Sequence, residues 1–348
     1  MTIDSVKIEF RRELATLYGP KESLSIFEMI AEDAGFSRNS LLLDGNQELT
    51  ESQKQYFENS LRRLKTAEPV QYVRGKAEFY GLQFTVNQSV LIPRQETEEL
   101  VDLIIRENRD CRGRIVDIGT GSGCIAVSLA KNIPLAQVCA VDISEQALNV
   151  ACENARKNDV NVDFFLGDMQ DESFMNQLSD CEIIVSNPPY VCLSEKPQMR
   201  PNVLNFEPHL ALFVTDENPL QFYESIAQFA LKNLVEGGKF YCEINETLGV
   251  ETKRLFDRYH LAHQFNLALC HSVIESSAIT KYWVDKHGCA LFTLLLAISC
   301  HKFGLFVAKH QSCTDGVETE SQFLPYRQCS TDVLCGILYV ELTIVEGV

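Results

Sequence analysis

The sequence predicts an α/β fold with a mainly parallel β-sheet, preceded by a small helical domain and a β-hairpin linker. Two observations predict the sheet: from about residue 94 short apolar runs alternate with helical patterns, and turn residues separate these segments. A third observation, apolar residues at helical spacing in residues 1–75, predicts the helical domain. Strands separated by helices form parallel βαβ units, so the sheet is the expected scaffold for a site.

Residues 1–75 contain a clear helix start as well as the apolar stripes. Thr50 stands at the N-cap position and Gln53 follows three residues later, which is the capping-box pattern. Pro69 marks the end of this helical section. We interpret residues 1–75 as a helical bundle that either only stabilises the fold or docks a substrate.

Residues 76–93 change character, because aromatic and β-branched residues stand around glycine and asparagine. This composition predicts a β-hairpin linker. We expect its strands at Ala77–Phe84 and Val86–Ile92, with a turn at Asn87-Gln88.

The alternating section predicts the remaining elements. The expected strands are Arg114–Ile118, Gln137–Val141, Val162–Leu166, Glu182–Ser186 and Lys239–Ile244. The expected helices are Thr97–Asn108, Cys124–Asn132, Glu145–Asn158 and Phe222–Leu234.

Composition narrows the function classes. The 348 residues carry a net charge of −17, which argues against a nucleic-acid partner, although a local basic cleft is compatible with an acidic total. The N-terminus has no apolar signal-peptide core, and the apolar run Cys289–Ser299 is too short to span a bilayer. The 13 cysteines show no regular framework, so we expect reduced thiols, no membrane association and a cytoplasmic location.

A glycine-rich turn between a strand and a helix is the first candidate binding feature. It reads Asp117-Ile118-Gly119-Thr120-Gly121-Ser122-Gly123, and its glycines let the backbone bend sharply beside a ligand. Asp142 ends the next strand, 25 residues after Asp117, and a carboxylate there suits a ribose diol. Each feature also has a purely structural interpretation: a tight turn, and a cap of the following helix.

Gly167-Asp168-Met169 ends the third strand of the sheet. Asp168 would face an adenine amino group and Met169 would pack on the ring. Turn chemistry explains the same residues equally well.

Asn187-Pro188-Pro189-Tyr190, at the end of the fourth strand, is the most specific feature. The prolines fix the backbone and remove two N–H donors, which leaves carbonyl groups as acceptors. The Asn187 side chain adds another carbonyl. Two such acceptors can hold both hydrogens of a planar NH2 group and orient its nitrogen, while Tyr190 offers an aromatic face.

All four features follow the carboxyl ends of parallel strands, the edge at which open α/β sheets bind ligands. In this order they resemble class I (Rossmann-like) methyltransferases that act on nitrogen. Leu91-Ile92-Pro93-Arg94-Gln95-Glu96-Thr97-Glu98 further resembles a signature of the HemK/PrmC family, the protein-(glutamine-N5) methyltransferases of peptide release factors. Further matches are Pro69-Val70-Gln71-Tyr72 with Gly75, Phe79-Tyr80-Gly81, Phe206-Glu207-Pro208 and Ala211-Leu212. The resemblance covers roughly residues 5–258.

The resemblance implies S-adenosyl-L-methionine as cofactor and peptide chain release factors 1 and 2 as protein substrates. It implies that the cofactor-binding residues are Asp117, Gly119, Thr120, Gly121, Ser122, Gly123, Asp142, Asp168, Met169 and Asn187. It implies that Asn187 to Tyr190 hold the substrate glutamine, with Asn187, Pro188 and Tyr190 catalytic and Pro189, Arg94 and Glu96 shaping the site. No metal is implied. Residues 94–258 would be the methyltransferase domain.

Two departures from the family pattern stand out. Gln95 replaces the usual proline, which should loosen a turn without removing a chemical group. Residues 259–348 lose the βαβ rhythm and hold six of the 13 cysteines. A fused extension or a shifted reading frame would explain this segment, and the second explanation fits better. We therefore expect the sheet to lack its usual last strands.

Two other functions remain open at this point. One is an N-methyltransferase that acts on an exocyclic amine of DNA or RNA after flipping a base into the pocket. The other is an inactive product whose C-terminus disrupts the fold. A zinc site at Cys300-His301, His310 and Cys313 has no recognised spacing, so we do not expect one.

Overall fold

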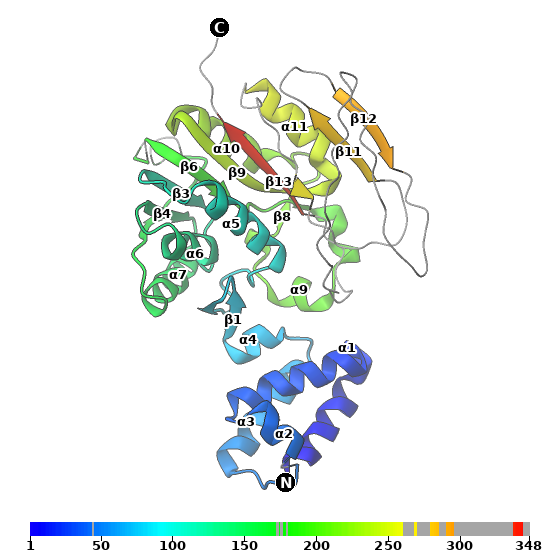
Figure 1. Cartoon of the computed structure of the whole chain (residues 1–348). Helices are drawn as coiled ribbons and strands as arrows, with labels where there is room; N and C mark the ends of the chain where they lie inside the picture. The colour runs from blue at the N-terminus through cyan, green and yellow to red at the C-terminus, as the bar shows by residue number, and fades with distance from the viewer. Residues whose placement is uncertain are drawn as a thin grey trace, which may run out of the picture. The chain divides into compact units, whose positions relative to one another are not determined.

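The computed structural model of the chain describes residues 1–43, 45–171, 174, 177–178 and 180–259, with the strands at 268–269, 279–284, 290–295 and 337–343. Figure 1 shows its elements. The helices are α1 (Ile3–Asp33), α2 (Arg38–Leu43), α3 (Glu51–Leu64), α4 (Val70–Arg74), α5 (Gln95–Glu107), α6 (Cys124–Asn132), α7 (Glu145–Lys157), α9 (Pro201–Phe206), α10 (Gln221–Asn233) and α11 (Gly249–Arg258). The 3-10 helices are η1 (Leu193–Gln198), η2 (His209–Ala211) and η3 (Glu246–Leu248). The strands are β1 (Lys76–Phe79), β2 (Leu82–Thr85), β3 (Arg114–Ile118), β4 (Gln137–Asp142), β5 (Asp163–Leu166), β6 (Cys181–Ser186), β7 (Val191–Cys192), β8 (Phe213–Val214), β9 (Leu234–Asn245), β10 (Ala268–Leu269), β11 (Ile279–Val284), β12 (Ala290–Leu295) and β13 (Ile337–Thr343).

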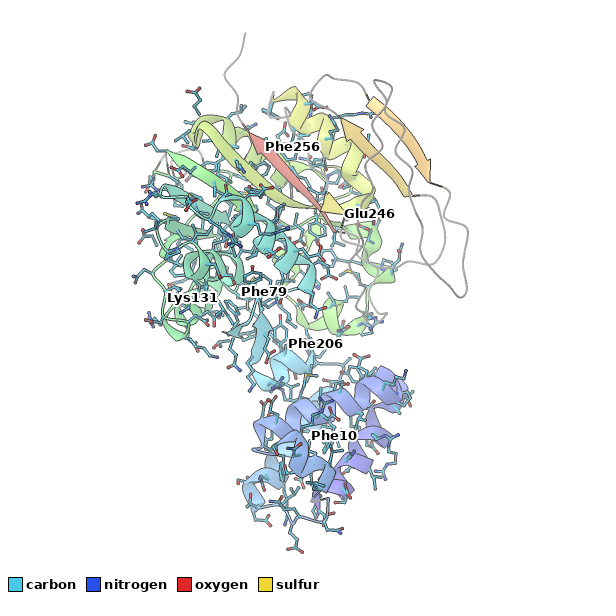
Figure 2. All side chains as sticks on the ribbon, viewed as in Figure 1. Phe10, Phe79, Lys131, Phe206, Glu246 and Phe256 are labelled. Atoms are coloured by element: carbon cyan, nitrogen blue, oxygen red, sulfur yellow. The ribbon has the colours of Figure 1, made fainter. Side chains whose placement is uncertain are left out.

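Helices α1 to α3 form the expected helical bundle. Its core holds Phe10, Phe27 and Phe57, whose ring centroids lie 5.7 to 6.1 Å apart; Phe10 is labelled in Figure 2. Helix α1 is kinked at Gly19, which has φ = 78°. Thr50 caps α3 through the predicted capping box with Gln53, which confirms that helix start.

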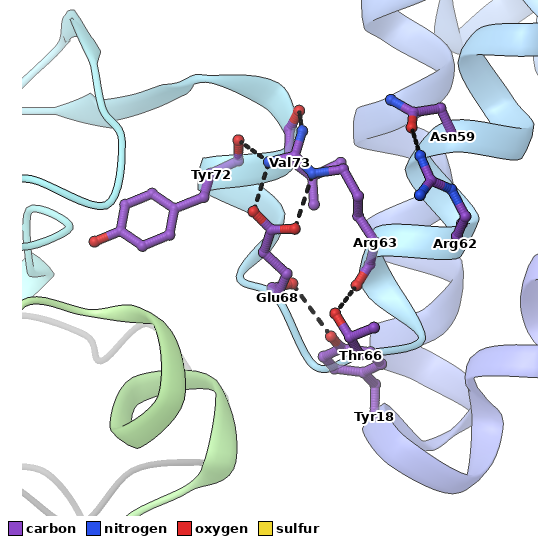
Figure 3. A network of polar contacts seen from close by, with 8 residues as sticks. All are labelled: Tyr18, Asn59, Arg62, Arg63, Thr66, Glu68, Tyr72 and Val73. Atoms are coloured by element: carbon purple, nitrogen blue, oxygen red, sulfur yellow. Dashed lines mark hydrogen bonds and ion pairs between the residues drawn. The ribbon is translucent and has the colours of Figure 1, made fainter.

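A polar network ties the end of α3 to α4 (Figure 3). The Arg63 guanidinium donates to the carbonyls of Tyr72 (3.0 Å) and Val73 (3.1 Å) and pairs with the Glu68 carboxylate. It therefore binds carbonyls in the last turn of the short helix α4, where few intrahelical hydrogen bonds form. The Tyr72 hydroxyl donates to the Val90 carbonyl at 2.6 Å, so α4 is also bound to the segment that follows the hairpin.

The linker is a β-hairpin, as predicted, but its turn was misplaced. Strands β1 and β2 pair antiparallel, with Phe79 opposite Leu82. The turn lies at Tyr80-Gly81, where φ is 48° and 72°, and residues 86–92 form no strand. A two-residue turn with both φ values positive matches the twist of the paired strands. A turn does form at Asn87-Gln88, where the Val90 backbone N–H donates to the Asn87 carbonyl at 3.1 Å, but it follows β2 and does not connect the hairpin strands.

The central sheet has the order β10-β13-β9-β6-β3-β4-β5. Strands β5, β4, β3, β6 and β9 run parallel, which confirms the α/β fold. Most predicted boundaries lie within two residues of the observed ones; β9 is the exception, because it begins at Leu234 and passes through Gly237, where φ is 76°.

Residues alternate between the two faces of the sheet. In β9, Phe240 and Cys242 pack into the core beside α10 and α11, whereas Tyr241 packs into the core beside α5, α6 and α7. By the same period, Glu243 faces the α5 side. A carboxylate is thus placed beneath the start of α5.

The expectation that the sheet lacks its last strands is wrong, because strands from the C-terminal segment pair with the sheet. Strand β13 pairs antiparallel with β9, Ile337 opposite Asn245, and β10 pairs with β13. The hairpin β11–β12 belongs to a separate compact unit, Cys270–Gly336. The candidate zinc ligands Cys300, His301, His310 and Cys313 lie outside the described residues. In the described part of the chain, each cysteine is free and no helix is long and apolar enough to cross a membrane.

Candidate active site

A cavity of about 460 Å³ lies at the carboxyl ends of β3, β4 and β6. The loop before α5 and the 3-10 helix η2 complete its walls. Of the predicted site residues, those that line it are Arg94, Gly119, Thr120, Gly121, Ser122, Asp142, Asp168, Met169, Asn187, Pro188 and Pro189. The structure therefore brings all four sequence motifs to one edge of the sheet. Asp117, Gly123, Glu96 and Tyr190 are not in the wall.

The glycine-rich turn is fixed to the neighbouring strand. Gly119 and Thr120 both donate their backbone N–H to the Val141 carbonyl at 2.9 Å. Gly121 has φ = 54° and donates to Oδ2 of Asp142 at 2.8 Å. Gly123 has φ = 79°, and a Cβ there would lie 3.0 Å from Cβ of Ala151 in α7. Gly123 thus serves close helix packing, and it does not line the cavity.

Asp142 presents an acceptor at the cavity. Its Oδ1 accepts from the Ser144 backbone N–H at 2.9 Å and its Oδ2 accepts from Gly121. Burial raises the pKa of Asp142, and these backbone hydrogen bonds oppose the rise. The N-cap of α7 is Ser144, whose hydroxyl accepts from Ala147, so Asp142 is not the cap of that helix. Each carboxylate oxygen keeps lone-pair capacity toward the cavity.

Asp117 lies fully buried behind the turn. Its Oδ2 accepts from the Thr120 hydroxyl at 2.6 Å and from the Ala126 backbone N–H at 3.2 Å. Burial raises its pKa to about 7, against the effect of those two hydrogen bonds. Its Oδ1 has no hydrogen-bond partner within the described residues. Asp117 therefore organises the turn, because Thr120 and the start of α6 are both bound to one carboxylate oxygen.

Asp168 and Met169 both line the cavity, and turn chemistry is also present. Oδ1 of Asp168 accepts from the Gln170 backbone N–H at 2.8 Å. Met169 is partly buried against the core beside α10 and α11. The two interpretations of this motif are compatible, since one carboxylate oxygen forms the turn while the residue still faces the cavity.

The Asn-Pro-Pro-Tyr motif follows β6 directly. Nδ2 of Asn187 donates to the Thr97 hydroxyl oxygen at 3.4 Å, and Pro188 and Pro189 form part of the wall. Tyr190 differs from the expectation of an aromatic face for the substrate. Its ring packs against the core beside α10 and α11, and its hydroxyl donates to Oε1 of Glu243 at 3.1 Å. Apolar burial and this hydrogen bond draw the ring away from the cavity.

Sequence reasoning missed three residues at this site: Thr97, Glu207 and Glu243. The Arg94 guanidinium pairs with Oε1 of Glu207 at 2.7 Å, and Oε2 of Glu207 accepts from the Ile92 backbone N–H. Oε2 of Glu243 accepts from the Thr97 hydroxyl at 2.9 Å. The sequence carried a signal for Glu243, because it is a single acidic residue inside the apolar strand Phe240–Ile244. Isolated charges avoid such positions unless they have partners.

Comparison with known proteins decides the family. The chain is 44% identical to the release factor glutamine methyltransferase of Flavobacterium psychrophilum, over 75% of this chain and 92% of the relative. The chain belongs to the release factor glutamine methyltransferase family. The resemblance to HemK/PrmC enzymes is confirmed, and so is the methyltransferase fold.

Other similarities agree with this family. Release factor glutamine methyltransferases of Bacteroides thetaiotaomicron and Streptococcus pneumoniae are 46% and 42% identical, over 71% and 72% of this chain and 88% of each relative. The Methyltransferase small domain model matches residues 96–203 and the PrmC N-terminal domain model matches residues 8–75. Among solved structures, TrmN from Thermus thermophilus is 22% identical over 49% of this chain and 42% of that chain. The TM-score of this match is 0.34.

Proposed function

We propose that this methyltransferase transfers a methyl group from S-adenosylmethionine to the side-chain amide nitrogen, N5, of the glutamine in the Gly-Gly-Gln motif of release factors 1 and 2. The observation that carries the proposal is that Asn187 and Pro188 line the same cavity as the glycine-rich turn and Asp142. The names of the relatives support release factors as the substrate class. These substrates would place the enzyme in the cytoplasm.

The cavity has groups that fit the proposed cofactor. Asp142 offers two carboxylate oxygens to a ribose diol. Met169 and Ile143 line the cavity, and Ile143 is 53% exposed although it is apolar, which suits contact with an adenine ring. The sequence reasoning missed Ile143. When bound, S-adenosylmethionine supplies a methyl group already activated by a positive sulfur.

The work left for the protein is to hold the amide nitrogen, whose lone pair is delocalised. Oδ1 of Asn187 and the carbonyl oxygen of Pro188 would each accept one hydrogen of the glutamine NH2 group. Both acceptors stabilise the positive charge that grows on nitrogen as the N–C bond forms and the C–S bond breaks. The excess proton then leaves the nitrogen for solvent.

The remaining predicted groups receive supporting roles in this proposal. Arg94, held by Glu207, shapes the substrate side of the cavity, and Glu96 supports this side from outside the wall. Residues 1–75 form a docking domain for the release factor, residues 76–93 are its linker, and residues 94–258 carry the reaction. Residues 259–348 receive no catalytic role.

A methyl-transfer assay tests the function. The protein, labelled S-adenosylmethionine and a release factor that carries Gly-Gly-Gln are mixed, and mass spectrometry locates the methyl group. We expect methylation of that glutamine by the wild type and a loss of at least about 100-fold in turnover in Asn187→Ala. Donor binding by Asn187→Ala should remain close to that of the wild type. Methyl transfer to an oligonucleotide, with no transfer to the release factor, would overturn the proposal.

A further inference from the structure

One buried carboxylate, that of Glu243, contacts Tyr190 of the Asn-Pro-Pro-Tyr motif directly and Asn187 through Thr97. Glu243 in β9 has 0% exposure. Its Oε1 accepts from the Tyr190 hydroxyl at 3.1 Å, and its Oε2 accepts from the Thr97 hydroxyl at 2.9 Å. Burying a carboxylate without hydrogen-bond partners destabilises the folded state, so these two hydrogen bonds fix the hydroxyl groups of Thr97 and Tyr190 against Glu243.

The Thr97 hydroxyl determines which way the Asn187 amide faces. A hydroxyl group has one hydrogen to donate, and Thr97 gives it to a carboxylate that can only accept. The Thr97 oxygen is therefore left as an acceptor. The group of Asn187 that faces it, at 3.4 Å, must be the NH2 group. The amide oxygen of Asn187 then points away from Thr97.

We propose that Thr97 and Glu243 are positioning residues that hold the Asn187 amide with Oδ1 available to the substrate NH2 group. The inference rests on the proposed function, because the value of this orientation is that an acceptor, not a donor, meets the substrate nitrogen. An inverted amide would direct its own N–H groups at the substrate N–H groups. Thr97 and Glu243 act through Asn187 and transfer no proton to the substrate.

The ionisation state of Glu243 controls the direction of these hydrogen bonds. A protonated Glu243 can donate to Thr97, which frees the Thr97 hydrogen to bind Oδ1 of Asn187 and inverts the amide. Burial raises the pKa of Glu243 to about 7, against hydrogen bonds from Thr97 and Tyr190 that lower it. The other titratable groups that act on or contact Glu243 are Arg94, Glu96, Cys124, Tyr223 and Cys242. Turnover should therefore increase as pH rises through about 7.

The first test compares Thr97→Val with Thr97→Ser. Valine keeps the β-branched shape and removes the hydroxyl, whereas serine keeps the hydroxyl. We expect Thr97→Val to lower kcat roughly 10-fold or more, with little change in KM for S-adenosylmethionine. Thr97→Ser should stay within about 3-fold of the wild type. Equal kcat values in wild type and Thr97→Val would overturn the proposal, as would equal losses in the two variants.

The matched control is Thr252→Val. Thr252 is also fully buried, and its hydroxyl donates to the Leu248 carbonyl in another part of the fold. This variant loses a buried hydroxyl but should keep the wild-type kcat. A fall in kcat as large as that of Thr97→Val would mean that the loss in Thr97→Val comes from general destabilisation, and it would overturn the proposal.

Glu243→Gln provides the second variant, because its side chain has no titration in this range. We expect a lower kcat and the loss of the rise in kcat that the wild type shows near pH 7. A rise that persists in Glu243→Gln would exclude Glu243 as its source and contradict the proposal. The wild type serves as the reference throughout: if it fails to methylate a release factor, the proposed function fails, whereas an active wild type with unaffected variants refutes only the positioning role.

Discussion

The hydroxyl of Tyr190 donates to Oε1 of Glu243 at 3.1 Å, so the last residue of the Asn-Pro-Pro-Tyr motif contacts strand β9 and does not line the cavity. The same carboxylate accepts from Thr97, which in turn accepts from Asn187. Four consecutive residues form this motif, but its position depends on Glu243, which lies 53 positions after Tyr190 in the chain. Its function depends on these non-local contacts.

Tyr190→Phe tests that relationship. The variant keeps the ring in the core and removes one of the two hydroxyl donors to Glu243. We expect a loss of about 1 to 2 kcal/mol in the free energy of unfolding, because a buried carboxylate loses a hydrogen bond. Turnover should fall less than in Asn187→Ala. Urea denaturation and the methyl-transfer assay measure the two effects; a stability equal to that of the wild type would show that the hydroxyl contributes nothing.

Asp142→Asn should weaken donor binding and leave the chemical step largely intact. Asparagine keeps one acceptor oxygen but replaces the other with an NH2 group, which would face the Gly121 N–H or the ribose hydroxyls. We expect the dissociation constant for S-adenosylmethionine to rise about 10-fold to 100-fold, equivalent to loss of one or two hydrogen bonds to a charged group. Titration calorimetry measures the constant. A variant that binds normally but turns over slowly would place Asp142 in catalysis instead.

Gly123→Ala should destabilise the fold through two causes that a control variant separates. At Gly123 a Cβ meets both a positive φ of 79° and Cβ of Ala151 at 3.0 Å. At Gly81, with φ = 72°, no atom lies within 4 Å, so Gly81→Ala introduces backbone strain alone. We expect a loss of about 1 kcal/mol for Gly81→Ala and about 2 to 4 kcal/mol for Gly123→Ala. Thermal or urea unfolding measures both; equal losses would mean that α7 moves away without cost.

Stability should fall as pH rises toward neutrality because of two buried carboxyl groups. Asp117 and Glu243 have pKa values of about 7 in the fold, above their ordinary values of 3.8 and 4.5. The folded state therefore binds more protons than the unfolded state between these limits. The stabilisation is complete below the ordinary values and is lost as pH rises through about 7.

Glu243→Gln isolates the share of one group in this pH dependence. Compared with the wild type, the variant should gain relative stability between about pH 5 and about pH 8, by up to roughly 3 kcal/mol. Urea denaturation at the two pH values measures the difference. A constant difference between wild type and variant would mean that the pKa of Glu243 is the same in the folded and unfolded states.

The sequence by itself determined the α/β fold, the helical bundle and the four motifs, because periodicity, capping residues and turn residues act over a few positions. It also placed Gly119 to Ser122, Asp142 and Asn187 at one sheet edge, since parallel strands put their carboxyl ends together. The hairpin turn was misplaced because Tyr80 adopts a positive φ that tyrosine rarely takes, and strand pairing enforces it.

Only the tertiary structure decided what each motif residue contacts. Tyr190 turns toward Glu243, Asp117 lies behind the glycine-rich turn, and Thr97 reaches Asn187, although 90 positions separate them. Strand β13 joins the sheet from a segment in which the βαβ rhythm of the preceding chain is lost. These contacts depend on which face of a strand packs against the start of which helix. Local sequence patterns do not specify which side chains are brought together by that packing.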